Sequence, residues 1–129
     1  GIGFALIDKR RPSPNKAKVA NLVGNLNNKD VIIIDDMIDT AGTTVNAAEK
    51  AMKNGARSVY SVATHALLSG EAIDRLKKSE IKQFIFTDTV FVPEEKRLSN
   101  MQFVTVSGIF GEAIRRIYNG ESVSALFNF

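Results

Sequence analysis

The sequence lacks several residue types and patterns, and each absence excludes a class of function. It has no cysteine, which excludes disulfides and thiolate metal sites, and a single histidine, which argues against a zinc site. It has no run of about 18 apolar residues, so no helix should span a membrane. The net charge is only +3, with a single dense basic run, so we expect no nucleic-acid partner. Together these features favour a cytoplasmic protein.

The length and the two ends of the sequence bear on domain organisation. Its 129 residues, 44% of them hydrophobic, suit a single domain with its own core. There is no internal repeat, low-complexity segment or linker. Residues 1–7 already form an apolar stretch, without an initiator methionine. A domain seldom opens on a buried strand, so we expect this sequence to be part of a longer protein or a processed product.

Short apolar segments alternate with amphipathic ones along the chain. Alternation of this kind indicates βαβ units and a three-layer α/β fold with a mostly parallel sheet. Ser69 suits the N-cap of the second helix, and the tail from residue 122 should be irregular or short-stranded. The expected strands are 4–7, 18–25, 31–34, 58–63, 83–87 and 103–106, and the expected helices are 43–54, 69–78 and 108–119.

The stretch VIIIDDMIDTAGTT, residues 31–44, joins a predicted buried strand to a predicted helix. Gly42 can adopt a positive φ and lets a ligand approach the backbone, and three threonines supply hydroxyls. The free N–H groups and the positive dipole end of the following helix favour an anion. Residues 30–49 contain no lysine, so this is not a Walker loop. The pattern therefore predicts a site for a terminal phosphate.

The acids of the same stretch should face another part of the ligand, because carboxylates repel phosphate. Vicinal sugar hydroxyls and Mg²⁺ both suit carboxylate oxygens, so a sugar phosphate satisfies the whole motif. Asp35 and Asp36 should point to opposite sides of the strand, so we expect only one of them to bind the sugar, together with Asp39. A simpler interpretation is a helix N-terminus whose dipole favours nearby acids. The complete string, placed behind a buried strand, favours the ligand site.

The motif VIIIDDMIDTAGTT resembles the phosphoribosyl-pyrophosphate signature of the type I phosphoribosyltransferase fold. That resemblance alone leaves open transferases that consume the compound and ribose-phosphate diphosphokinases that make it. The order ALIDKRRPSPN, VANLVGN and VIIIDDMIDTAGTT, with THALLSGEAIDRL and EAIRRIYNGESVSALF further on, resembles the diphosphokinase family. The likeness implies one phosphoribosyltransferase-like domain over residues 1–129, the C-terminal lobe of a two-lobed enzyme whose N-terminal lobe is absent.

This resemblance implies an activity and a set of site residues. The activity is transfer of the diphosphoryl group of ATP to the 1-hydroxyl of ribose 5-phosphate, with Mg²⁺ as cofactor and a homo-oligomeric complete enzyme. Lys9 would be the catalytic cation and Arg11 a substrate contact. No metal ligand is certain in this chain, because the family's ligands lie in the other lobe. The implied ribose 5-phosphate site is Asp35, Asp39, Thr40, Ala41, Gly42 and Thr43, and Ser122 and Phe127 match a regulatory nucleotide site or simple C-terminal packing.

Two alternatives stay open beside the diphosphokinase. One is a stand-alone phosphoribosyltransferase, and the other is a catalytically silent phosphoribosyl-binding regulatory module. A silent module should have lost the basic loop or the TAGT run, and both are intact here. We expect residues 1–129 by themselves to bind ribose 5-phosphate weakly at best and not to turn over.

Overall fold

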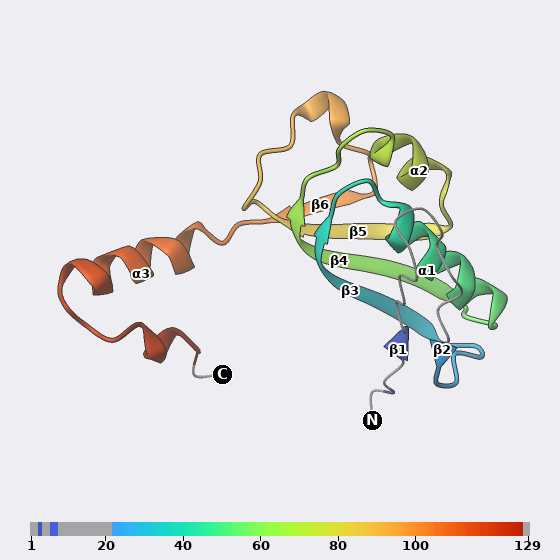
Figure 1. Cartoon of the computed structure of the whole chain (residues 1–129), viewed down its shortest axis with the longest axis horizontal. Coiled ribbons are helices and arrows are strands. Elements are labelled where there is room, and N and C mark those ends of the chain that lie inside the picture. Colours follow the sequence, from blue (N-terminus) through green and yellow to red (C-terminus); the bar gives the residue numbers. More distant parts are fainter. Residues whose placement is uncertain (1–2, 4–5, 8–21, 128–129) are drawn as a thin grey trace, which may run out of the picture.

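The computed structural model of the chain describes residues 3, 6–7 and 22–127 (Figure 1). The predicted basic loop, with Lys9 and Arg11, lies outside the described residues. The elements in chain order are β1 (Leu6–Ile7), β2 (Leu22–Val23), β3 (Asp30–Ile38), α1 (Gly42–Lys53), β4 (Ser58–Ala66), α2 (Ala72–Lys78), β5 (Ile81–Thr87), the 3-10 helix η1 (Glu94–Lys96), β6 (Met101–Val104), α3 (Ser107–Tyr118) and the 3-10 helix η2 (Val123–Phe127).

Four parallel strands form the main sheet in the order β3-β4-β5-β6, and β1 pairs with β2 as a separate antiparallel ribbon. The predicted α/β class with a mostly parallel sheet is therefore confirmed. In the register of β3 with β4, Asp35 lies opposite Ala63 and Ile38 opposite Ala66. The two strands thus end together, and the chain leaves both at the same edge of the sheet, where ligands bind in open α/β sheets.

The core lies between one face of the sheet and the helices α1 and α2. Alanines on one side of α1 allow the helix to approach β3 and β4 closely, and Ala48 and Ala51 are buried there. Phe84 and Phe86 on β5 are fully buried, and Leu76 joins them from α2. Full burial of one such aromatic side chain contributes about 1.5–3 kcal/mol. This packing holds β3, β4 and α1 in one rigid unit around the edge where the strands end.

The other face of the sheet is open in the part of the chain that the structure describes. Ile32 and Ile34 of β3 are exposed, Ile34 by 80%, and β3 is the first strand in the sheet order. The prediction that residues 31–34 form a buried strand is therefore wrong for one of its two faces among the described residues. The helix that could supply a third layer, α3, extends away from the sheet and packs mainly against η2 (Figure 1). Its apolar side chains, including Ile114 and Ile117, are exposed.

Several predicted boundaries also differ from the structure. The third strand does not end at Ile34: β3 runs through both acids to Ile38, because its pairing with β4 continues that far. The second helix begins at Ala72 with Glu71 as its N-cap residue, so Ser69 is not the cap. The tail forms the 3-10 helix η2 rather than a short strand. Among the described residues, the helices are too short or too polar to cross a membrane.

Candidate functional site

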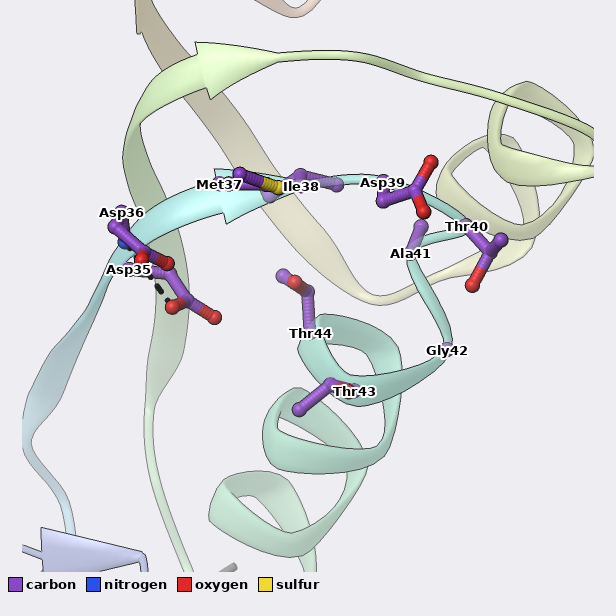
Figure 2. A pocket seen from close by; sticks show the side chains of 10 residues that line it. All are labelled: Asp35, Asp36, Met37, Ile38, Asp39, Thr40, Ala41, Gly42, Thr43 and Thr44. Carbon is purple, nitrogen blue, oxygen red and sulfur yellow. Dashed lines mark hydrogen bonds between the residues drawn. The ribbon is translucent and has the colours of Figure 1, made fainter. Parts of the chain in front are cut away.

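A cavity of about 310 Å³ lies at the carboxyl end of β3, where the chain turns into α1 (Figure 2). Its lining, among the residues that the structure describes, is the continuous stretch from Asp35 to Thr44. This stretch contains the predicted sugar-phosphate motif, and the structure brings its acids, threonines and glycine to one cavity. The volume lies at the lower end of the usual range for small-molecule sites, about 300–1,000 Å³.

The turn between β3 and α1 depends on a left-handed residue that is not a glycine. Ala41 has φ 63° and ψ −2° and is only 4% exposed. A left-handed conformation costs an L-residue roughly 1–2 kcal/mol, so contacts around the turn must hold Ala41 there. The prediction that Gly42 supplies a positive φ is wrong, because Gly42 already begins α1. A Cβ at Gly42 would lie 3.4 Å from Nη1 of Arg75, so the guanidinium group of Arg75 packs beside this glycine.

The first turn of α1 forms one side of the cavity. The N–H of Val45 donates to the carbonyl of Ala41 at 3.0 Å, which starts the helix. The N–H groups of the first turn before it have no acceptor within the helix. The first turn carries no acidic side chain, and Thr43 there is exposed. Helix N-termini of this kind bind phosphate through their amides and their dipole.

The acids of the motif lie at two ends of the cavity. Figure 2 shows Asp35 and Asp36 on the strand at one end and Asp39 on the turn at the other. The N–H of Asp36 donates to Oδ1 of Asp35 at 3.1 Å. Asp39 accepts a hydrogen bond on Oδ1 from the hydroxyl of Ser69, which comes from the segment after β4. Because the acids are spread along the lining, they would contact different parts of a bound sugar phosphate.

Asp35, Asp36 and Asp39 are the side chains of this lining whose charge would suit a metal ion. Within the described ranges, no group of three or more acidic or histidine side chains is arranged to hold such an ion. The cavity acids offer oxygen atoms but do not converge on one point. These residues therefore do not form a complete metal site by themselves. An ion that arrives with a phosphate ligand needs only one or two protein carboxylates.

The other predicted functional residues either lie outside the described residues or are absent from the lining of this cavity. Lys9 and Arg11 are outside the described residues, so their roles stay predictions. Ser122 and Phe127 lie in the segment after α3 and are exposed, and the hydroxyl of Ser122 accepts from the N–H of Ser124 at 3.2 Å. The single histidine, His65, bonds through Nδ1 to the hydroxyl of Thr89 at 2.8 Å and does not line the cavity.

Marked pKa shifts in the described part of the chain belong to groups outside the lining of the cavity. Hydrogen bonds from Arg57 and Ser58 hold the pKa of Asp30, at the start of β3, well below its usual range. Hydrogen bonds from Thr105 and the Val106 N–H lower the pKa of Asp88, at the end of β5. These carboxylates accept bonds that fix the backbone, so their shifts are structural.

Sequence reasoning missed two residues that contact the turn, Ser69 and Arg75. Ser69 was predicted to cap a helix, and Arg75 was given no role. Arg75 donates through Nη1 to the carbonyl of Thr40 at 3.0 Å. The two residues are 30 and 35 positions away from their partners, and no local pattern reports a contact over such a separation.

The fold and the cavity first define a class. This is an α/β domain that presents a helix N-terminus and several carboxylates at the carboxyl end of a parallel strand. A comparison with family models then gives the particular family. Over residues 7–128 the chain matches, and belongs to, the family described as the phosphoribosyl synthetase-associated domain.

Comparison with curated proteins and solved structures agrees with this family and confirms the predicted resemblance. The chain is 51% identical over 124 residues to the ribose-phosphate pyrophosphokinase of Caldanaerobacter subterraneus subsp. tengcongensis, covering 96% of this chain and 39% of the relative. It is 47% identical over 125 residues to that of Bacillus subtilis, covering 97% of this chain and 39% of the relative. The crystal structure of phosphoribosylpyrophosphate synthetase from Mycobacterium smegmatis matches with a TM-score of 0.77 and 31% identity, covering 81% of this chain and 35% of that one. The chain thus spans about two fifths of the length of these curated relatives.

Proposed function

We propose that this chain is the ribose 5-phosphate-binding lobe of a ribose-phosphate diphosphokinase. The enzyme would transfer the diphosphoryl group of ATP to the 1-hydroxyl of ribose 5-phosphate, giving phosphoribosyl pyrophosphate and AMP for nucleotide biosynthesis. One observation carries the proposal: a single cavity combines the open amides of a helix N-terminus with carboxylates at the end of a strand. The names of the relatives support the reaction class.

Each half of the motif would bind one half of the substrate. The 5-phosphate would accept hydrogen bonds from the first-turn amides of α1 and from the hydroxyls of Thr40 and Thr43. The hydroxyls of the ribose would donate to Asp35 and Asp39, whose carboxylates accept at different ends of the cavity. With both ends of the sugar phosphate held, the 1-hydroxyl would be left at the mouth of the site, open to ATP.

The reaction itself forms a bond from the 1-oxygen to the β-phosphorus of ATP and breaks the bond from that phosphorus to the oxygen shared with the α-phosphate. AMP leaves with that oxygen, and the proton of the 1-hydroxyl is released. Charge builds on the phosphoryl oxygens, and catalysis depends on positioning and electrostatic stabilisation. Lys9 would supply the cation and Arg11 a substrate contact. Mg²⁺ would enter as the ATP complex, because this ion is usually bound through substrate phosphates.

The proposed substrate site can be tested on the chain itself. We expect ribose 5-phosphate, added to the ¹⁵N-labelled chain, to shift the amide resonances of residues 39–44 in an NMR titration, and ribose without phosphate to leave them in place. Asp39→Asn should weaken the binding, because a carboxylate acceptor is lost. Asp74→Asn, an exposed change on α2 outside the cavity lining, is the matched control. Shifts elsewhere with residues 39–44 unaffected would contradict the assignment.

The proposed reaction is tested in the longer protein that carries this lobe. There ATP and ribose 5-phosphate should yield AMP and phosphoribosyl pyrophosphate. Lys9→Ala should lower kcat by about 10²- to 10³-fold, the usual cost of losing one charged contact in the transition state. Lys53→Ala, an exposed lysine at the end of α1, should leave kcat unchanged.

Two outcomes of that assay would favour other functions. Consumption of phosphoribosyl pyrophosphate together with a base would indicate a phosphoribosyltransferase, and binding without turnover would indicate a silent regulatory module. We also expect no AMP from residues 1–129 alone. The complete enzyme is proposed to be a cytoplasmic homo-oligomer.

A further inference from the structure

The segment from Leu67 to Arg75, which comprises the connection from β4 to α2 and the first turn of α2, binds three successive carbonyls at the turn between β3 and α1. The carbonyl of Ile38 accepts from the N–H groups of Leu67 and Leu68 at 3.0 and 3.1 Å. The carbonyl of Asp39 accepts from the N–H of Ser69 at 3.1 Å. The carbonyl of Thr40 accepts from Nη1 of Arg75 at 3.0 Å. The main-chain carbonyls of residues 38, 39 and 40 therefore all point toward this segment.

This arrangement matters for an anion because carbonyl oxygens repel it and amide N–H groups attract it. In a trans peptide the C=O and the following N–H point in opposite directions. Carbonyls 38–40 that face the 67–75 segment therefore leave the N–H groups of residues 39–41 on the opposite side of the backbone. The next carbonyl, that of Ala41, is taken up by the N–H of Val45. On the side that faces away from the segment, the turn therefore presents N–H groups and no carbonyl oxygens.

Two side chains of the segment add contacts that the backbone alone does not make. The hydroxyl of Ser69 donates to Oδ1 of Asp39, which leaves Oδ2 of that carboxylate for another donor. Arg75 joins the turn to the start of its own helix, α2, because its Nη2 also pairs with Oε2 of the N-cap residue Glu71 at 2.9 Å. The guanidinium group lies beside Gly42, where an added Cβ would be 3.4 Å from Nη1. Neither Ser69 nor Arg75 lines the cavity, so neither is a ligand contact.

We propose that Ser69 and Arg75 are positioning residues for the ribose 5-phosphate site. Arg75 keeps the turn in the conformation that directs its amides to phosphate and supports the left-handed Ala41, and Ser69 orients the Asp39 carboxylate toward a sugar hydroxyl. This assignment rests on the proposed function for its ligand, but its structural part stands on the contacts of the turn. The two residues act on different halves of the substrate, so their effects separate.

The test compares two probes, inorganic phosphate and ribose 5-phosphate, by NMR titration of the ¹⁵N-labelled chain. Arg75→Gln should weaken the binding of both probes by about 3- to 10-fold, the range expected for the loss of one hydrogen bond. Ser69→Ala should weaken the binding of ribose 5-phosphate by a similar factor and leave the binding of inorganic phosphate unchanged. Ser69→Thr keeps the hydroxyl and should restore binding.

Matched controls exclude a general loss of structure. Arg57→Gln removes an exposed arginine that is likewise paired with a carboxylate, Asp30, at the other end of the strands. Ser99→Ala removes an exposed serine hydroxyl away from the turn. Both should bind like the unmodified chain, and all variants should keep the dispersed spectrum of a folded protein.

The outcomes separate this inference from the proposed function. If the unmodified chain binds ribose 5-phosphate and both variants bind it equally well, the positioning role is wrong and the proposed function stands. If the unmodified chain binds neither probe, the proposed function fails, and the positioning role is then decided by the free protein. In that case Arg75→Gln must change the φ-dependent coupling constant of Ala41, and an unchanged coupling overturns the role.

Discussion

The turn at residues 38–44 buries Ile38, Ala41 and Thr44, whereas α3 exposes its apolar side chains, and the two regions are held in opposite ways. The turn is fixed by groups 30 and 35 residues further along the chain, Ser69 and Arg75. The ion pairs of α3 and of the residues just after it join groups three to six positions apart, around Glu112, Arg115 and Glu121. One region is thus defined by tertiary contacts, and the other by its own sequence.

Local contacts can form a helix without fixing where that helix lies in the fold. Local pairs stabilise α3 as a helix without fixing it on the sheet, and its apolar side chains remain exposed. The turn has no such local support, since its left-handed Ala41 is unfavourable in isolation. Its shape comes from bonds to a neighbouring segment. A substitution far from the cavity in sequence can therefore change the cavity, whereas substitutions in α3 should stay local.

The largest contrast is expected from truncating one apolar side chain in the sheet core and one on α3. Phe84→Ala, in the buried core on β5, should lower the free energy of unfolding by about 3–5 kcal/mol through lost burial and a cavity. Ile114→Ala on α3, where the side chain is 66% exposed, should stay within about 0.5 kcal/mol. Urea denaturation of both variants measures this. A large loss for Ile114→Ala would show that α3 buries this face in solution.

A smaller contrast comes from two Asn-Gly sequences that end α1 and α3. Gly55 and Gly120 have φ of 85° and 68°, so alanine is strained at both, by about 1–2 kcal/mol. At Gly55 the added Cβ would also lie 2.8 Å from Oδ1 of Asn27, whereas at Gly120 it meets nothing within 4 Å. Gly55→Ala should therefore lower the melting temperature more than Gly120→Ala. Equal losses would mean that backbone strain alone sets the cost.

The smallest expected effect is an acid-induced loosening confined to α3. Hydrogen bonds from Arg115, then Arg116, lower the pKa of Glu112 to about 2 from an ordinary value of 4.5. A lowered carboxyl pKa stabilises the folded form above the unfolded value, so this support is complete above about pH 4.5 and is lost as pH falls toward 2. NMR titration of the Glu112 side chain should give the low pKa, and Glu112→Gln should remove the pH dependence of the α3 amide shifts. A midpoint near 4.5 would contradict the ion pairs.

Much of the fold could be predicted from local pattern. The apolar run before Asp35 predicts a strand, and the alanine-rich stretch after Gly42 predicts a helix. The alternation of such segments predicts a parallel sheet, and the structure confirms all three. The strand end was misplaced because the pairing of β3 with β4 carries the acids into the strand as far as Ile38. Helix α3 was predicted with nearly correct ends, since its periodicity is local. The position of α3 away from the sheet could not be predicted, because periodicity shows that one face of the helix is apolar but does not show which element that face packs against.

For the site, the sequence by itself determined which groups gather at the end of β3, because strand, turn and helix follow one another directly from Asp35 to Thr44. Only the tertiary structure decided how they are presented. It made Ala41, not Gly42, the left-handed residue, and it joined the turn to Ser69 and Arg75. The physical reason is that a hydrogen bond between groups 30 residues apart forms only after the sheet has brought the ends of β3 and β4 together.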